Sequence, residues 1–394
     1  MGVGMTARRA AGVALTAGIL ASTVMGAGSV AAQSPSAAPA ASGGAAPTCD
    51  AVQFGNAIVR CENFYTDYWP IINSKLDALY QEAKATDGGK LVIWDWYPRS
   101  DAEIAAFNAR FPDIHVETQG FTYQVSDQII TAQATGQRNT DVVSGSITSM
   151  TAMYDQGFWK KVDWTSMGVP AEFTAPWGYT ELLPDSFNSP LLQYNTTKVT
   201  SVPTSLDDLN TPDLAKQLGI ASYNAQNFTG YGMANGQDKM LALIQGLLDN
   251  GMTISDNASD LLSSGDLPIS FAGQLFSDNP DLAVSAFTQA NAYAQFSGVN
   301  EYATNPAAAA LWVLWYAYDP DWLKTRLTDP AFGTSSEPYP GLPTATFDQA
   351  TGLIAKNQAA YFEIAQDPTT TFETKDDRDA FNALIDAANG LFYQ

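Results

Sequence analysis

The order of apolar and polar positions predicts a chain of alternating helices and strands. From Tyr68 to Ala85, apolar side chains recur every three or four residues, which predicts a helix with one buried face. Gly88 and Gly89 end this helix. Residues 91–97 then form a short apolar run, which is typical of a strand covered on both faces of a parallel sheet.

The same pattern repeats further along the chain. Ser100 is expected to cap a helix that runs to Arg110, because Glu103 lies three residues later and completes a capping box. Strands are predicted at 114–120 and 141–146, with a helix between them at 126–135. Strand and helix therefore alternate, which predicts an α/β fold with right-handed crossovers.

A second α/β segment follows a region of loops that begins after Gly157. Strands are predicted at 218–224 and 267–273, and helices at 238–248, 256–264, 305–317, 346–359 and 376–392. The length of 394 residues is enough for two domains of ordinary size.

The N-terminus has the pattern of an exported protein. Arg8 and Arg9 precede an apolar run of small residues, and a small-residue cleavage pattern follows at 30–32, so residues 1–32 are predicted to be a signal peptide. Residues 33–48 are rich in Pro, Ala, Ser and Gly and are expected to be a flexible linker. Cys49 and Cys61 follow directly, and two close cysteines in an exported chain favour a disulfide over a metal site.

Charge and composition exclude several classes of function. The formal net charge is -22, with 41 acidic and 19 basic residues, which disfavours nucleic acid as a partner. His115 is the single histidine, so histidine triads and multi-histidine metal sites are excluded. No phosphate-binding loop or dinucleotide fingerprint is present. We therefore expect a binding protein that is not an enzyme and carries no cofactor. A secreted carbohydrate-active enzyme with a carboxylate pair, and an adhesion or scaffold module, are the alternatives.

Six segments in order resemble a known family. They read ALYQEAKATDGGKLVIW, FNARFPDIHVE, TAQATGQRNTDVV, YNTTKVTSVPTSLDDLNTPDLA, GDLPIS and EYATNPAAAALWVLW. Together they resemble the extracellular solute-binding proteins of ABC importers, of the ferric-iron type. The resemblance implies a type II periplasmic-binding-protein fold, which has two α/β lobes, two crossover segments and a ligand cleft between the lobes.

By the same analogy, residues 49–188 plus 300–394 form lobe 1, and residues 189–299 form lobe 2. The implied protein is a monomer that is secreted, periplasmic or held at the cell surface. It captures a small solute and delivers it to a membrane permease. Closure of the two lobes around the ligand is the expected motion.

Ligand-binding residues are expected where predicted strands end, because open α/β sheets bind ligands beyond the carboxyl ends of their strands. The candidates in lobe 1 are Asp95, Trp96, Tyr97, Arg99, Ser144 and Ser146, and those in lobe 2 are Tyr223, Asn224, Asn227 and Tyr231. Aromatic faces beside neutral polar groups suit a sugar or polyol, whereas Asp95 could supply a countercharge to a polyamine-like cation. Trp96 could instead fill the core, and Ser144 and Ser146 could instead cap a helix.

Ferric iron is the alternative ligand within this family. The iron-binding members use a pair of adjacent tyrosines shortly before the chain returns to the first lobe. In this sequence Tyr293 and Tyr302 are separated in that region. The sequence therefore departs from the iron-binding pattern, and no metal site is predicted.

Overall fold

The fold is described from a computed structural model of the chain. The structure describes residues 47–49, 51–54, 58–61, 63–95, 98–120, 125–135, 140–146, 150, 153–154, 156–173, 180–188, 191–272, 281–285, 293–328, 337–338 and 375–393. The predicted signal peptide, most of the predicted linker and the predicted helix at 346–359 lie outside these residues.

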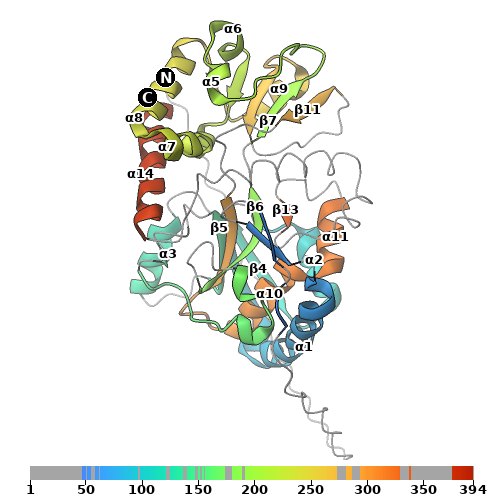
Figure 1. The fold of residues 1–394 in the computed structure, drawn as a ribbon. Coiled ribbons are helices and arrows are strands. Elements are labelled where there is room, and N and C mark those ends of the chain that lie inside the picture. The colour runs from blue at the N-terminus through green and yellow to red at the C-terminus, as the bar shows by residue number, and fades with distance from the viewer. Residues whose placement is uncertain are drawn as a thin grey trace, which may run out of the picture. The chain divides into compact units, whose positions relative to one another are not determined.

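The first of two larger sheets carries the parallel strands that the sequence predicts. Its order is β13-β6-β12-β5-β3-β4. The strands are β3 (Lys90–Asp95), β4 (His115–Gly120), β5 (Val142–Ser146), β6 (Leu182–Asn188), β12 (Tyr293–Val299) and β13 (Glu337–Pro338). β3 pairs in parallel with both β4 and β5, while β12 runs antiparallel to β5 and β6. The sheet is therefore mixed, with its parallel strands on one side of β12. Figure 1 labels β4, β5, β6 and β13 of this sheet.

The second larger sheet is built from the middle of the chain. Its order is β11-β7-β10-β8-β9. The strands are β7 (Leu191–Asn195), β8 (Leu218–Ile220), β9 (Thr253–Ile254), β10 (Ile269–Ala272) and β11 (Leu282–Ser285). β8 pairs in parallel with β9 and β10, whereas β7 is antiparallel to both of its neighbours. Each sheet thus combines parallel strands with antiparallel ones.

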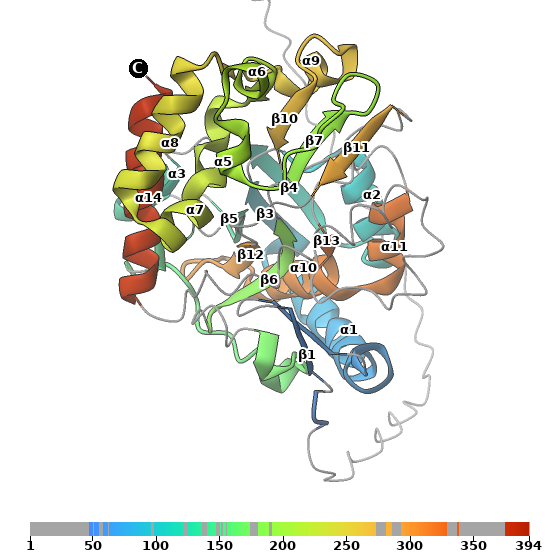
Figure 2. The ribbon, with the colours of Figure 1, turned by 45° about the horizontal axis from the view of Figure 1, so that its top comes forward.

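The chain passes between the two sheets between β6 and β7, and again between β11 and β12. These two passages correspond to the predicted crossovers. Two segments, however, fall on the other side of the predicted division into lobes. β12 belongs to the first sheet, and α14 (Lys375–Phe392) packs against α7 (Thr229–Asn235) and α8 (Gln237–Asp249), as Figure 2 shows.

The packing of α14 follows from its apolar stripe. Its buried side chains recur every three or four residues, at Phe381, Leu384, Ile385, Ala388 and Phe392. Leu384 lies over a glycine of α7, and Phe392 meets Phe228 edge to face with the ring centroids 6.1 Å apart. The stripe thus covers the helices of the second sheet.

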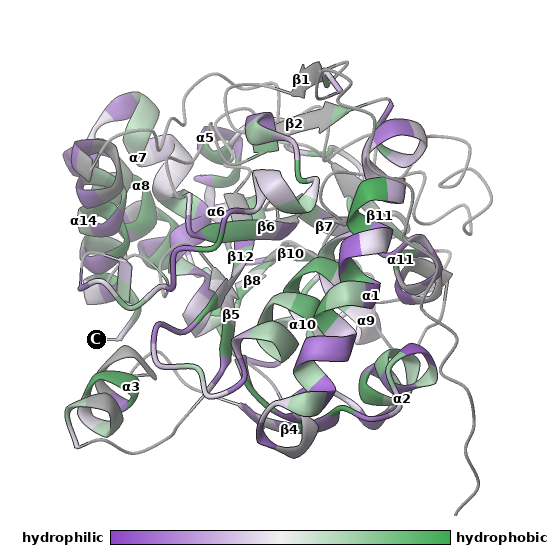
Figure 3. Cartoon of the chain, turned by 90° about the horizontal axis from the view of Figure 1, so that it is seen from below, coloured by the Kyte–Doolittle hydropathy of each residue, from purple (hydrophilic) through white to green (hydrophobic). Residues whose placement is uncertain are grey.

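Helix α10 (Pro306–Tyr318) forms the centre of the core beside the first sheet. It is apolar on all sides, and every residue from Ala307 to Tyr318 is buried, as expected for a helix surrounded by other elements. It packs against α1 (Trp69–Ala85), β6 and β12. Phe107 of α2 (Asp101–Arg110) meets Trp312 and Trp315 at centroid distances of 4.8 and 5.0 Å. Figure 3 shows α10 mostly in the hydrophobic colour, whereas α14 carries both colours.

Two polar side chains fix the start of α10 to the first sheet. The buried carboxylate of Asp141 accepts from the backbone N–H of Val92 at 2.9 Å and of Thr304 at 2.8 Å. Asn305 caps α10 by accepting from the N–H of Ala308 at 3.1 Å. Its amide also donates to the carbonyl of Ala83 at the end of α1. These bonds join three elements that are distant in sequence.

Most of the predicted local elements are confirmed. α1, α2, α3 (Val125–Ala134), α8, α9 (Ala258–Ser264), α10 and α14 lie where the periodicity predicts helices. The capping box between Ser100 and Glu103 is present. The predicted disulfide is also present, with 5.2 Å between the Cα atoms of Cys49 and Cys61, beside the hairpin of β1 (Ala51–Phe54) and β2 (Ile58–Cys61).

The predicted strand at 218–224 is wrong in its second half. β8 ends at Ile220, and Ser222–Phe228 is a 3-10 helix. The side chains of Asn227 and Phe228 are buried in this segment. Tertiary packing of these side chains therefore overrides the apolar run that suggested a longer strand. Among the residues described, no helix combines the length and hydrophobicity needed to cross a membrane.

Candidate functional site

Two candidate residues of the first sheet, Asp95 and Ser146, are the last residues of parallel strands. β3 ends at Asp95, which is paired in register with Gly120 at the end of β4. β5 ends at Ser146 in the same direction. Loops at this edge of an α/β sheet are the usual place for a ligand. Trp96 and Tyr97, which follow β3 directly, lie outside the described residues, so their predicted roles stay predictions.

Arg99 joins two carboxylates at this edge. Its guanidinium forms an ion pair with Asp95 through one terminal nitrogen and with Glu103, at 3.2 Å, through the other. The side chain of Arg99 is 7% exposed, and those of Asp95 and Glu103 are each 15% exposed. We call these three residues the Arg99 clasp. It anchors the last residue of β3 to the first turn of α2, on either side of the segment that carries Trp96 and Tyr97 in the sequence.

An aromatic ring covers the clasp. The guanidinium carbon of Arg99 lies 4.1 Å from the ring centroid of Tyr316, and that of Arg326 lies 5.0 Å from the same centroid. Burial raises the pKa of Tyr316, against the opposing effect of the two arginines. Burial would lower the pKa of Arg99, but the charges of the nearby acidic groups, Asp95 first among them, together outweigh it, so the net change is upward. Arg99 is therefore a permanent cation held between carboxylates and a ring.

The two serine candidates differ in position. Ser144 is buried inside the sheet, where its hydroxyl shares a 2.7 Å hydrogen bond with that of Ser297 on β12. Ser297 in turn donates to the buried carboxylate of Asp185 on β6 at 2.5 Å. This polar chain crosses three strands beneath the sheet edge. Ser146 stands at the end of β5, but its side chain lies outside the described residues.

The candidates of the second sheet follow β8. Tyr223 is 43% exposed and Asn224 is half-buried, so both are accessible. Asn227 is buried and its amide donates to the carbonyl of Phe271 at 3.0 Å. Tyr231 is also buried, and its hydroxyl donates to Asp207 at 2.9 Å. Burial, followed by this hydrogen bond, raises the pKa of Tyr231. Asn227 and Tyr231 thus support the segment that presents Tyr223 and Asn224.

Sequence reasoning missed Tyr316, Arg326, Asp185 and Ser297. Tyr316 belongs to an apolar helix, so the sequence pattern indicates only that its ring is part of the core. Arg326 lies in α11 (Pro320–Thr328). Asp185 and Ser297 lie on strands that the local pattern did not predict. Among the described residues, no group of three or more His, Cys, Asp or Glu side chains could hold a metal ion.

Sequence comparison alone identifies no relative. No protein-family model matches this sequence, and no curated protein matches it either.

Comparison of structures, in contrast, finds many similar chains. Iron-bound HitA from Pseudomonas aeruginosa has a TM-score of 0.52 and 16% identity, over 71% of this chain and 99% of HitA. The spermidine/putrescine ABC transporter substrate-binding protein PotD from Streptococcus pneumoniae has a TM-score of 0.55 and 15% identity, over 77% of this chain and 99% of PotD. AfuA from Actinobacillus pleuropneumoniae is a periplasmic binding protein with fructose-6-phosphate bound. It has a TM-score of 0.54 and 13% identity, over 75% of this chain and 97% of AfuA.

These similarities show the fold. They cover almost the whole of each neighbour. The chain therefore has the two-lobed fold of periplasmic and ABC-transporter substrate-binding proteins, as the resemblance in sequence implied. These neighbours are binding proteins by description, and their stated ligands differ from one another.

Proposed function

We propose that this protein is the extracellular substrate-binding component of an ABC importer, that it is not an enzyme, and that it acts as a monomer. The observation that carries the proposal is the fold, in which two mixed sheets are joined by two passages of the chain and match binding proteins over nearly their full length. The predicted signal peptide supports export, and the acidic composition disfavours a nucleic-acid partner. The permease is the partner that receives the solute.

The proposed ligand site is the carboxyl edge of β3, β4 and β5 together with the residues that follow β8. From the first sheet it takes Asp95, Trp96, Tyr97 and Arg99. From the second sheet it takes Tyr223 and Asn224, which are accessible. The proposed site therefore contains the aromatic residues Trp96, Tyr97 and Tyr223. Asn227 and Tyr231 do not contact the solute in this proposal but support the segment that does.

The Arg99 clasp favours a neutral polyhydroxylated ligand such as a sugar or polyol. Arg99 already neutralises Asp95, so a polyamine would have to compete with a buried guanidinium for that carboxylate. A polyamine is the second candidate, because neighbours of the same fold are described as spermidine/putrescine proteins.

A thermal-shift screen tests this proposal. The mature protein would be heated with glucose, myo-inositol, fructose 6-phosphate, putrescine, spermidine and ferric citrate in turn. A ligand at about 100 times its Kd stabilises the folded state by about 2.7 kcal/mol, so the binding compound should raise Tm in a dose-dependent way. A shift with a sugar or polyol supports the neutral site, and one with spermidine alone supports the second candidate. Conversion of a compound into products would contradict the proposal.

Two tyrosine variants locate the site. Tyr223→Ala should weaken binding of the stabilising compound about threefold to tenfold, since one aromatic contact is lost. Tyr302→Ala is the matched control, because Tyr302 is 68% exposed and lies beyond β12 at the opposite edge of the first sheet. Equal affinity in both variants would mean that the residues after β8 do not contact the solute.

A further inference from the structure

A carboxylate that belongs to neither predicted set of site residues lies at the carboxyl edge of the second sheet. β8 and β9 run in parallel, with Ile220 paired with Ile254. The backbone N–H of Ser255 then donates to the carbonyl of Ile220 at 2.8 Å, so the pairing continues one residue beyond β9. Asp256 is the next residue, and it contacts Ser222 at the start of the 3-10 helix after β8. Asp256 therefore lies at the same sheet edge as the residues proposed to contact the solute.

Two hydrogen bonds orient this carboxylate. Its Oδ1 accepts from the backbone N–H of Ser222 at 3.1 Å and from the hydroxyl of Ser222 at 2.7 Å. Ser222 directly precedes Tyr223 and Asn224, the two accessible candidates of the second sheet. Asp256 itself is exposed. The carboxylate is thus held beside the proposed site without being buried.

The bonds of Asp256 are not those of a helix cap. The sequence predicts a helix at 256–264, in which an aspartate at the first position would be a capping residue. In the structure α9 begins at Ala258, its N-cap is Asn257, and the cap makes no side-chain hydrogen bond. The carboxylate of Asp256 instead binds a residue that follows the neighbouring strand. Its role therefore lies at the sheet edge, where the two parallel strands end.

Asp256 keeps capacity to accept a further hydrogen bond. Within the described residues it forms no ion pair, and both bonds from Ser222 go to Oδ1. An ionised carboxylate has about four acceptor positions on its two oxygens and no donor. Asp95 of the proposed site differs, because Arg99 already neutralises it. Of these two carboxylates, Asp256 is the one that a solute reaches without displacing a cation.

We propose that Asp256 accepts a hydrogen bond from a hydroxyl group of the transported solute. This inference rests on the proposed function and adds a charged acceptor to the site formed by Tyr223 and Asn224. A polyamine fits less well, because it carries more than one ammonium group, whereas the segments after β8 and β9 bring one carboxylate to this edge at Asp256. Asp256 also sets specificity, because a carboxylate repels a solute with an anionic group at this position, such as a sugar phosphate.

Isothermal titration calorimetry of the Asp256→Asn variant tests this proposal. The probe is whichever of glucose and myo-inositol raises the Tm of the mature protein. The Asn side chain keeps an oxygen that can accept both bonds from Ser222, so the Tm without sugar should stay the same. The affinity for the sugar should fall about tenfold, because a hydrogen bond to a charged acceptor becomes one to a neutral acceptor. Fructose 6-phosphate should bind the variant more tightly than the unmodified protein, because the repulsion is removed.

Two further variants separate this role from a structural one. Asp260→Asn is the matched control, because Asp260 is exposed on α9 four residues later and should leave the affinity unchanged. Ser222→Ala removes one bond to Oδ1 but keeps the carboxylate. If Asp256 only holds Ser222 in place, both Ser222→Ala and Asp256→Asn would lower the Tm without sugar, and Asp256→Asn would bind sugar and sugar phosphate in the original ratio. That result would overturn the proposal.

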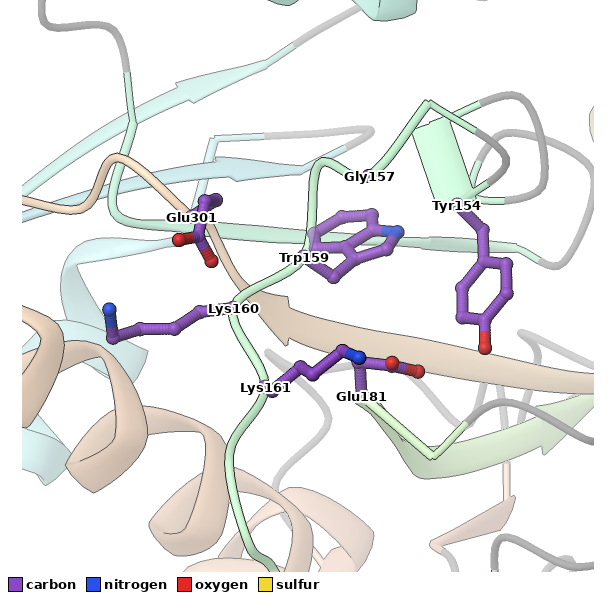
Figure 4. Close-up of a pocket in the computed structure, with 7 residues that line it drawn as sticks. All are labelled: Tyr154, Gly157, Trp159, Lys160, Lys161, Glu181 and Glu301. Atoms are coloured by element: carbon purple, nitrogen blue, oxygen red, sulfur yellow. The ribbon is translucent and has the colours of Figure 1, made fainter.

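A pocket elsewhere on the protein is the competing location for a sugar. Its volume is about 590 Å³, and its lining includes Tyr154, Lys160, Lys161, Glu181 and Glu301. Figure 4 shows the two lysines pointing in opposite directions, and the two glutamates balance their charge. Glu301 lies two residues beyond Val299, which is paired with Val142 at the start of β5. This pocket is therefore at the amino end of β5, away from the carboxyl edge of the strands.

Glu301→Gln distinguishes the two locations. Glu301 is exposed, so the variant should fold, and it should bind the sugar as tightly as the unmodified protein does. Weaker binding in Glu301→Gln together with unchanged binding in Asp256→Asn would place the sugar in the pocket of Figure 4 and overturn the proposal.

Failure of this inference differs from failure of the proposed function. If neither glucose nor myo-inositol raises the Tm, a neutral solute is the wrong ligand class and the inference fails with it. If one of them raises the Tm but binds Asp256→Asn as tightly as the unmodified protein, the inference alone is overturned and the proposed function stands.

Discussion

Removal of the Arg99 guanidinium should destabilise the protein strongly. Arg99→Met keeps most of the aliphatic stem but leaves Asp95 and Glu103 as two carboxylates, each 15% exposed, without their cation. It also removes the contact at 4.1 Å from the Tyr316 ring centroid. Breaking a buried ion pair by deleting one partner costs about 3–5 kcal/mol, and we expect about 3 kcal/mol here because the carboxylates retain some solvent.

Urea denaturation of the mature protein, followed by tryptophan fluorescence and circular dichroism together, measures this loss. Asp95→Asn in the Arg99→Met background should recover about 1 kcal/mol or more, since the variant then has one negative charge fewer at the position of the lost guanidinium. Lys216→Met is the control, because its pair with Asp213 is largely exposed and should contribute less than about 1 kcal/mol. A loss below about 1 kcal/mol in Arg99→Met, or additive effects in the double variant, would refute the reasoning.

Three further predictions concern the cap, the alkaline range and the disulfide. Asn305→Ala should lower the free energy of unfolding by about 2–4 kcal/mol in urea denaturation, because a helix cap and a buried bond to the end of α1 are lost together; a loss under about 1 kcal/mol would contradict this. The pKa of Tyr231 is raised in the folded state, so its contribution to stability is present below pH 10 and is lost as the pH rises through the folded pKa. The decline of Tm above pH 10 should therefore be shallower in Tyr231→Phe, and an identical decline would count against this role. Intact mass should be about 2 Da lower before reduction than after it, since Cys49 and Cys61 are bonded, whereas two alkylatable thiols in the exported protein would contradict the bond.

The parts of the fold that depend on local sequence could be predicted. The capping box of Ser100 and Glu103 depends on only four consecutive residues, and the apolar run of β3 is continuous, so both were predictable. β12 was not, because it is held by antiparallel neighbours that are distant in the chain. The 3-10 helix after β8 was missed for a related reason, since its form depends on burial of Asn227 and Phe228.

The positions of the candidate residues at strand ends were predictable, but their contacts were not. The ends of β3 and β8 follow from the α/β pattern, and Asp95 and Arg99 were identified there. That the two residues pair with each other, and that Tyr316 covers them, depends on a helix that lies far away in the sequence. Local patterns carry no information about such contacts.

Small-angle X-ray scattering with and without the solute found by thermal shift tests the central claim most directly. Two lobes joined by two passages of the chain should close on their ligand, as hinge-type binding proteins do. The radius of gyration of the mature protein should therefore decrease on addition of saturating solute and return to its starting value after dialysis. A radius of gyration that stays the same at saturation would contradict a solute-binding clamp.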